Sequence, residues 1–264
     1  MEPVYVPTLK SITDAAHRIH RVVAKTPLMK SHTYSKRFNA NLQLKREDLQ
    51  QVRSYKIRGA YNKLSSLSLS EKQRGIVCAS AGNHAQGVAF SCAQLKVNGT
   101  IYMPTTTPLQ KIAQVRMFGE EWVTVVLEGD IYDEAFEAAH TFCTNSNKIF
   151  VHPFDDEKII EGQATVGIEL TTQATQPLDY VFVPVGGGGL LSGVAAVFHY
   201  LSHKTKIIGV EPEGAAAMYN SLSRKQNTTL EKIDKFVDGA AVQRVGERNF
   251  AIAQQYVDEV ATVS

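Results

Sequence analysis

The sequence contains little cysteine and no strong excess of charge of either sign. Its cysteines, Cys78, Cys92 and Cys143, are an odd number without the spacing of metal ligands, so a disulfide framework and a zinc site are not expected and the thiols should be free and buried. Lysine and arginine total 28 against 26 aspartates and glutamates, which gives a formal net charge of +2. The charges are interspersed, so we expect a small-molecule partner, no nucleic acid and no membrane.

Long apolar runs, internal repeats and low-complexity segments are also absent. No stretch approaches the run of about 18 apolar residues that a membrane span requires, and the first residues lack the basic and apolar regions of a secretory leader. We therefore expect a cytoplasmic protein. With 264 residues, 44% of them hydrophobic and 20% charged, the chain has the composition of a globular protein of one large or two small domains.

The sequence does show a regular alternation of β-rich runs and helical patterns. Strands are expected at residues 42–44, 76–79, 100–103, 122–127, 179–185, 206–210 and 259–263. Helices are expected over 11–23, 108–119, 156–172, 190–201, 214–223 and 247–257, with two more that begin at 84 and 131. This rhythm is typical of parallel βαβ units, so the predicted fold class is α/β.

Three of these elements carry more specific expectations. Pro108 fits the first turn of its helix, and Gly119 fits the position just past the last turn. The run 179–185 is the strongest predicted strand and has the composition of a buried one. The strand 259–263 lies at the end of the sequence, which leaves one face of a parallel sheet without its covering helix and indicates a shortened chain.

Four consecutive glycines, Gly186 to Gly189, lie between a predicted strand and a predicted helix. Glycines there let the backbone approach a ligand, and the helix N-terminus offers free N–H groups to an anion, which indicates a phosphate site. The run lacks the spacing of dinucleotide-binding folds and the lysine of a P-loop, so the kind of phosphate stays open. The alternative is a tight turn without a ligand.

The segment from Ser80 to His84 also joins a strand to a helix. A serine hydroxyl, an asparagine amide and free backbone N–H groups converge there, which suits a carboxylate. The alternative is a plain helix cap, because Ser and Asn are favoured cap residues. His84 alone is more typical of a structural hydrogen-bond donor than of a catalyst.

Lys56 and Arg58 precede the helical pattern of residues 61–67. Cations at the N-terminus of a helix oppose its dipole, which is expected where function overrides stability. A lysine with a lowered pKa is the usual route to a covalent bond with a carbonyl compound. The residues alone leave open a solvated surface lysine.

Five segments carry a resemblance to a known family, and they follow the family's order over nearly the whole chain. They are Lys45-Arg-Glu-Asp-Leu49, Ser54-Tyr-Lys-Ile-Arg-Gly-Ala60, Ala79-Ser-Ala-Gly-Asn-His-Ala-Gln-Gly87, Pro184-Val-Gly-Gly-Gly-Gly-Leu190 and Val210-Glu-Pro212. With these segments the chain resembles the fold-type II pyridoxal-phosphate enzymes, within them the threonine dehydratase and serine racemase group, and most closely the short bacterial threonine dehydratases.

The resemblance implies pyridoxal 5′-phosphate as cofactor and a role for each motif. Lys56 would be the catalytic lysine that bonds covalently to the cofactor and moves protons. Asn83 would contact the 3′-hydroxyl of its ring. The cofactor phosphate would be bound by Gly186, Gly187, Gly188, Gly189 and Leu190. The substrate carboxylate would be bound by Ser80, Ala81, Gly82, Asn83 and His84.

The resemblance also implies a two-lobed architecture like that of the tryptophan synthase β-subunit, with parallel-rich sheets flanked by helices. Residues 1–70 and 152–264 would form a large cofactor-binding lobe, and residues 71–151 a small lobe that closes over substrate. Family members continue beyond a strand like 259–263 to a serine that hydrogen-bonds the pyridine nitrogen, so we expect a fragment with a truncated C-terminal lobe. A homo-oligomer, dimer or tetramer, is also implied.

The implied reaction is the conversion of L-threonine to 2-oxobutanoate and ammonia, the step that leads into isoleucine biosynthesis, and of L-serine to pyruvate. Related racemases carry a second serine where this chain has Ala81, and an acidic metal ligand soon after Glu211 where it has residues 214–217, Gly-Ala-Ala-Ala. Both differences favour the dehydratase, and we expect no metal. The alternatives are serine racemase, another β-elimination or β-replacement enzyme of this fold type, and a truncated cofactor-binding chain without turnover.

Overall fold

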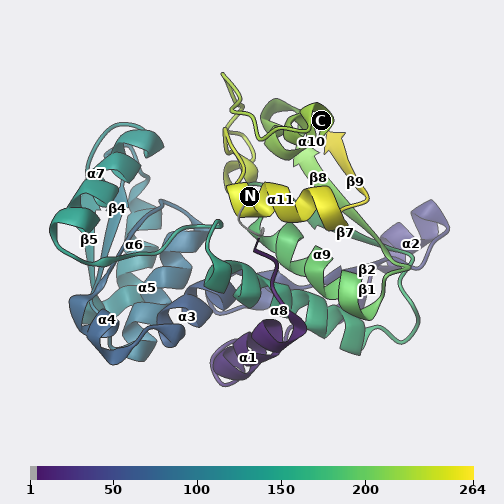
Figure 1. The fold of residues 1–264 in the computed structure, drawn as a ribbon, viewed down its shortest axis with the longest axis horizontal. Helices are drawn as coiled ribbons and strands as arrows, with labels where there is room; N and C mark the ends of the chain where they lie inside the picture. The colour runs from purple at the N-terminus through teal and green to yellow at the C-terminus, as the bar shows by residue number, and fades with distance from the viewer. Residues whose placement is uncertain (1–4) are drawn as a thin grey trace.

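The computed structural model describes residues 5–264 (Figure 1). The α-helices are α1 (Leu9–Ile19), α2 (His32–Phe38), α3 (Lys56–Ser66), α4 (Leu69–Arg74), α5 (Asn83–Leu95), α6 (Leu109–Gly119), α7 (Tyr132–Asn145), α8 (Glu157–Gln173), α9 (Gly189–Leu201), α10 (Ala217–Arg224) and α11 (Glu247–Tyr256). The strands are β1 (Leu28–Lys30), β2 (Gln43–Lys45), β3 (Ile76–Ala79), β4 (Gly99–Met103), β5 (Val123–Leu127), β6 (Ile149–Phe150), β7 (Tyr180–Pro184), β8 (Lys206–Pro212) and β9 (Glu259–Val263). Short 3₁₀ turns are η1 (Glu47–Leu49), η2 (Glu120–Trp122), η3 (Glu213–Ala215) and η4 (Asp238–Ala240).

The strands form three sheets. Four parallel strands have the order β5-β4-β3-β6, three parallel strands have the order β7-β8-β9, and β1 and β2 form an antiparallel pair. Figure 1 shows the four-stranded sheet with α5, α6 and α7 on one side of the molecule and the three-stranded sheet with α9 and α11 on the other. The predicted α/β class with parallel sheets flanked by helices is confirmed.

Side chains alternate between the two faces of the four-stranded sheet, and those of β3 are buried on both faces. Ile76 and Cys78 of β3 point into the core that contains α5, whereas Val77 and Ala79 pack with Cys143 of α7. Cys78, Cys92 and Cys143 are free and buried, as the sequence predicts.

The three-stranded sheet is buried on one face only. Val183, Ile207 and Val260 pack in the core beneath α9. On the other face of β7, Tyr180 and Phe182 stack on each other and are 53% and 61% exposed. The expectation of a buried strand at 179–185 is therefore wrong for one face, because Tyr180 and Phe182 point away from the core that contains Val183 and remain exposed.

Several helix boundaries also differ from the prediction. The first helix, expected over 11–23, runs from Leu9 to Ile19; it begins earlier because Thr8 caps it and forms a reciprocal capping box with Ser11. The helix expected over 214–223 is α10, Ala217–Arg224. In α6, Pro108 is the cap instead of a first-turn residue, and Gly119 is the last helical residue; Glu120 after it has a positive φ of 49°. Among the described residues, no helix has both the length and the hydropathy that crossing a membrane requires.

Candidate functional site

Lys56 is the first residue of α3, where both it and Arg58 lie in the opening turn. Its Nζ donates a hydrogen bond to the carbonyl oxygen of Pro153 at 2.8 Å, and burial lowers the pKa of the amine to about 8. A Cβ atom on Gly87 of α5 would lie 3.1 Å from the Lys56 carbonyl carbon, so this glycine allows α5 to approach the start of α3. The amine is thus held near the opening of two helices and is neutral more often than an ordinary lysine.

His84 lies in the first turn of α5 and is buried. Its Nε2 is 3.1 Å from the carbonyl oxygen of Val151, so Nε2 carries the hydrogen and donates it. Burial, and secondarily the charge of Lys56, lower the pKa of the imidazole to about 3. The ring is therefore neutral at physiological pH.

The glycine run connects the carboxyl end of β7 to α9. Gly188 has a φ of +92°, which favours glycine, and a Cβ atom on Gly187 would overlap the ring of Phe154. No side chain caps the N-terminus of α9, so its first-turn N–H groups remain available to an anion. Leu190 lies in the same turn and is buried. The geometry has the features that a phosphate site needs.

The segment 151–155 links the three motifs, and this role was missed by the sequence analysis. The carbonyl of Val151 bonds to His84, that of Pro153 bonds to Lys56, and the ring of Phe154 covers Gly187. One signal could have revealed it: a His-Pro-Phe-Asp run follows directly on β6, at the edge of the parallel sheet where ligands often bind.

The segment from Ser80 to Asn83, where the sequence predicts a carboxylate site, makes the fewest contacts of the three motifs. The hydroxyl of Ser80 accepts a hydrogen bond from the Gly82 N–H at 3.2 Å, Ala81 is half-buried, and Asn83 is exposed. Within residues 5–264 no hydrogen bond joins the side chains of Ser80 or Asn83 to Lys56 or to the glycine run. The loop follows β3 directly and leads to His84, but the roles of its residues in binding stay predictions.

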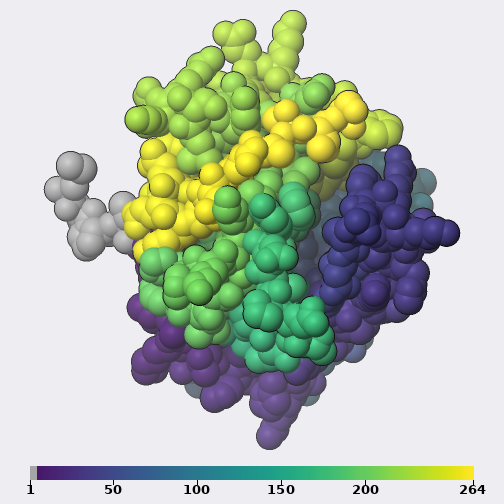
Figure 2. Space-filling view, turned by 90° about the vertical axis from the view of Figure 1, so that its right-hand side faces the viewer, coloured from purple at the N-terminus to yellow at the C-terminus, as the bar shows by residue number. Residues whose placement is uncertain are grey.

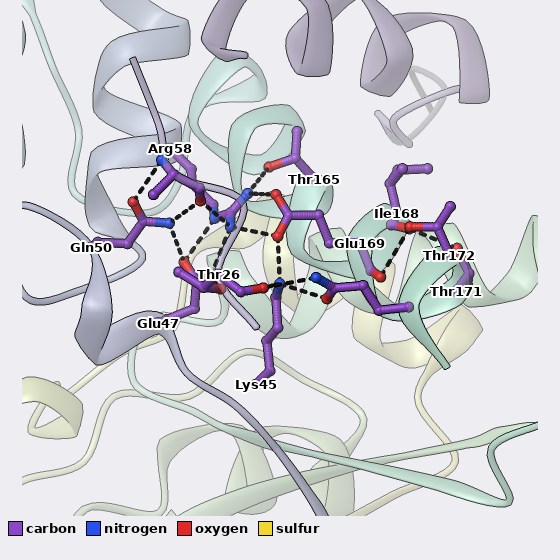
Figure 3. Close-up of polar contacts among 12 residues, drawn as sticks. Thr26, Lys45, Glu47, Gln50, Arg58, Thr165, Ile168, Glu169, Thr171 and Thr172 are labelled. Atoms are coloured by element: carbon purple, nitrogen blue, oxygen red, sulfur yellow. Dashed lines mark hydrogen bonds and ion pairs between the residues drawn. The ribbon is translucent and has the colours of Figure 1, made fainter. Parts of the chain in front are cut away.

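A buried ionic network anchors the other side of α3 (Figure 3). The Arg58 guanidinium is fully buried and donates to the carboxylates of Glu47 and Glu169, at distances of 2.7 to 3.0 Å. Lys45 also pairs with Glu169 and donates to the Thr26 carbonyl. The network ties η1, α8 and the chain before β1 to the turn that carries Lys56.

Glu211, the residue compared with a racemase metal site, has a structural role here. Its buried carboxylate accepts hydrogen bonds from the N–H groups of Met218 and Tyr219, both at 2.8 Å, at the start of α10. Within residues 5–264 no group of three or more His, Cys, Asp or Glu side chains is arranged to hold a metal ion.

The pKa of Glu211 predicts a pH-dependent change in stability. Burial raises this pKa to about 7, and the backbone donors only partly offset it. A carboxyl whose pKa is raised by folding favours the folded state below its unfolded pKa of about 4.3 and loses that contribution as the pH rises to 7. Against Glu211→Gln, which cannot ionise, the wild-type free energy of unfolding should fall by about 1–3 kcal/mol between pH 4 and 8. Urea unfolding at several pH values measures this, and parallel curves for the two proteins would contradict it.

The junction of these motifs suits a cofactor that carries a phosphate and a reactive carbonyl. Four buried polar side-chain atoms have no hydrogen-bond partner in the described part of the chain, and three of them belong to these motifs or to residues that contact them: Ser54 Oγ, His84 Nδ1 and Asn249 Oδ1. They lie two residues before Lys56, on the His84 ring, and beside the glycine run. Such atoms are uncommon in native proteins and mark places where a ligand or water completes the site.

Comparisons with known proteins indicate the family and its cofactor. The family model for "Pyridoxal-phosphate dependent enzyme" matches residues 19–264. The chain is 49% identical over 255 residues to L-threonine dehydratase biosynthetic IlvA of Halalkalibacterium halodurans, with 97% of this chain and 61% of that protein covered. It therefore spans about three fifths of the length of the curated relatives it matches.

Solved structures give the same result. The processed form of threonine deaminase isoform 2 from Solanum lycopersicum is 41% identical with a TM-score of 0.91, covering 100% of this chain and 77% of that one. Maize serine racemase is 28% identical with a TM-score of 0.93, covering 98% and 77%. With a family model that matches nearly its whole length and a fold shared with these enzymes, the chain belongs to the family of pyridoxal-phosphate dependent enzymes.

Proposed function

We propose that the protein is a threonine ammonia-lyase, which converts L-threonine to 2-oxobutanoate and ammonia and L-serine to pyruvate and ammonia. The observation that carries the proposal is the Lys56 amine, whose pKa burial lowers to about 8 and which lies beside the segment that also contacts the glycine run. The names of the relatives support the choice of threonine as substrate and a biosynthetic role, which we propose to be the step that leads into isoleucine synthesis.

The cofactor would be held at its two ends. Gly186 to Gly189 and Leu190 would donate backbone N–H groups to the phosphate at the start of α9, and Lys56 would bond to the carbonyl carbon. Asn83 would contact the ring hydroxyl. When bound, pyridoxal phosphate supplies an electron sink for the negative charge left on the substrate α-carbon.

Lys56 would also move the substrate proton. An amine with a pKa near 8 is partly neutral at physiological pH, so Nζ can accept the α-proton and return it. The loop of Ser80, Gly82 and Asn83 would bind the substrate carboxylate through its hydroxyl, amide and backbone N–H groups. His84 is neutral and its Nε2 is occupied by Val151, so we give it the task of fixing this loop against the segment 151–155.

Ala81 favours elimination over racemisation. A racemase needs a second acid or base on the opposite face of the substrate, and the methyl group of Ala81 cannot donate or accept a proton. Serine racemases share the fold, but similarity of fold does not supply that group.

The lobes, the assembly and the location of the protein are part of the same proposal. Residues 71–151, which contain the four-stranded sheet, would form a small lobe that closes over substrate against the large lobe of residues 1–70 and 152–264. The ion pair between Lys111 of α6 and Asp238 of η4, at 2.5 Å, joins the two and supports closure. The enzyme would work in the cytoplasm as a homo-oligomer.

The test is an assay of the protein supplied with pyridoxal phosphate and L-threonine. We expect 2-oxobutanoate and ammonia in equal amounts, and pyruvate from L-serine. Formation of D-serine without a 2-oxo acid would instead support a racemase. Cofactor binding without any product would leave a cofactor-binding chain and overturn the proposed activity.

A further inference from the structure

The N-terminus of α11 lies directly behind the glycine run, and we propose that Asn249 is a positioning residue that fixes this run for the cofactor phosphate. The inference rests on the proposed function, because it assigns the phosphate to Gly186–Gly189. Asn249 is fully buried in the first turn of α11. Figures 1 and 2 show α11 lying against the segment that contains α9.

The Asn249 amide bonds to the backbone on both sides of the site. Its Nδ2 donates to the carbonyl of Gly187 at 2.9 Å and to the carbonyl of Phe154 at 3.1 Å. Both partners can only accept, which fixes the orientation of the amide. One side chain thus holds the glycine run and the segment that contacts Lys56 in register.

This contact determines where the loop presents its donors. The carbonyl of Gly187 and the N–H of Gly188 belong to one planar trans peptide and point in opposite directions. Asn249 and the N–H of Gly246, at 3.1 Å, both hold that carbonyl toward α11. The N–H of Gly188 is therefore directed away from α11. Because Gly188 has a positive φ and no side chain, little else restrains this peptide.

The helix that carries Asn249 is itself well anchored. The carboxylate of Asp155 accepts hydrogen bonds from the N–H groups of Glu247 and Arg248, at 3.0 and 3.1 Å, and Ser192 of α9 donates to the Asn249 carbonyl at 3.2 Å. The amide therefore acts from a rigid support, as a residue that positions a binding loop should.

Asn249 also has an acceptor to spare. Both Nδ2 hydrogens are used, but Oδ1 is buried without a partner in the described part of the chain. An unsatisfied buried acceptor lowers stability, so packing alone does not explain an asparagine at this position. The requirement for a two-hydrogen donor beside the glycine run does explain it.

The test compares the affinities for pyridoxal phosphate and for pyridoxal, which lacks the phosphate. The ratio of the two affinities reports on the glycine run, whereas a general loss of structure lowers both affinities. Asn249→Asp has the same shape but cannot donate when its carboxylate is ionised, and Asn249→Thr keeps one donor and is the milder change. Asn62→Ala is the matched control, since Asn62 is a buried asparagine of α3 that donates to the Lys158 carbonyl at 2.7 Å and makes no hydrogen bond to the glycine run or to the residues that hold it.

We expect Asn249→Asp to lose about tenfold or more in affinity for pyridoxal phosphate, with less than about a twofold change for pyridoxal, because one misdirected hydrogen bond to a charged group has an effect of that size. The affinity of Asn249→Thr for pyridoxal phosphate should lie between those of the wild type and Asn249→Asp, and Asn62→Ala should keep the wild-type preference. If the wild type shows no preference for the phosphate, the proposed function fails. If the wild type shows it and Asn249→Thr, or a folded Asn249→Asp, retains it in full, the role of Asn249 is overturned.

Discussion

Replacing Lys56 with alanine abolishes covalent attachment of the cofactor and lowers the turnover of threonine by about 10²–10⁴-fold or more, the range that positioned proton transfer alone contributes. The reason is that, in the proposed function, the amine has two tasks, as nucleophile toward the cofactor carbonyl and as base toward the α-proton. No other lysine of residues 5–264 donates to the segment 151–155. Borohydride reduction followed by peptide mass spectrometry shows the attachment, and 2-oxobutanoate formation measures turnover.

The pH dependence tests the same amine without a substitution. Burial lowers the pKa of Lys56 to about 8, and only the neutral amine attacks a carbonyl. The rate of attachment should therefore rise with pH through a midpoint near 8, well below the value of about 10.4 for an exposed lysine.

Lys63→Ala is the matched control, because Lys63 lies on the same helix but pairs with Asp156 at 2.6 Å. It should retain attachment and turnover. Attachment that persists in Lys56→Ala, or that is lost equally in Lys63→Ala, would contradict the assignment.

Much of this site could be predicted from side-chain patterns, and what was missed depends on the backbone. The sequence placed Lys56 at a helix start and the glycine run between a strand and a helix, and the structure confirms both positions. The segment 151–155 entered the predictions only as the boundary between the two expected lobes. Its contacts with Lys56 and His84 are made by carbonyl groups, which every residue possesses, so no residue type reveals them.

The fold, like the site, was predicted only in part. The strands at 76–79 and 259–263 were predicted with their observed limits, because β-rich runs bounded by polar residues locate strands well. The exposed face of β7 was not predicted. Tyr180 and Phe182 are residue types that favour strands, so the sequence predicts the strand. It does not predict which face of the strand is covered, because that depends on which elements pack against it.

The network around Arg58 leads to the second large effect, which is on stability. Arg58→Met removes the guanidinium that pairs with Glu47 and Glu169. Lys45 still pairs with Glu169, but Glu47 loses its ion-pair partner, and leaving a buried charge without its partner costs about 3–5 kcal/mol. Burial alone would raise the pKa of Glu47, but the hydrogen bonds from Arg58 hold it below its ordinary value. Without Arg58 this carboxyl should bind a proton more readily, so the loss of stability should be largest near pH 7 and smaller near pH 4.

Urea unfolding at the two pH values measures the effect, with Arg46→Ala as the matched control. Arg46 is one residue before Glu47 and pairs with Asp48 at 2.7 Å, but both side chains are solvent-accessible, so its removal should cost only about 0–1 kcal/mol. A loss in Arg58→Met that is as small as the control, or one that does not decrease toward pH 4, would show that the buried carboxylates do not depend on Arg58. The same turn of α3 carries Lys56, so these ion pairs also hold the backbone from which its amine projects.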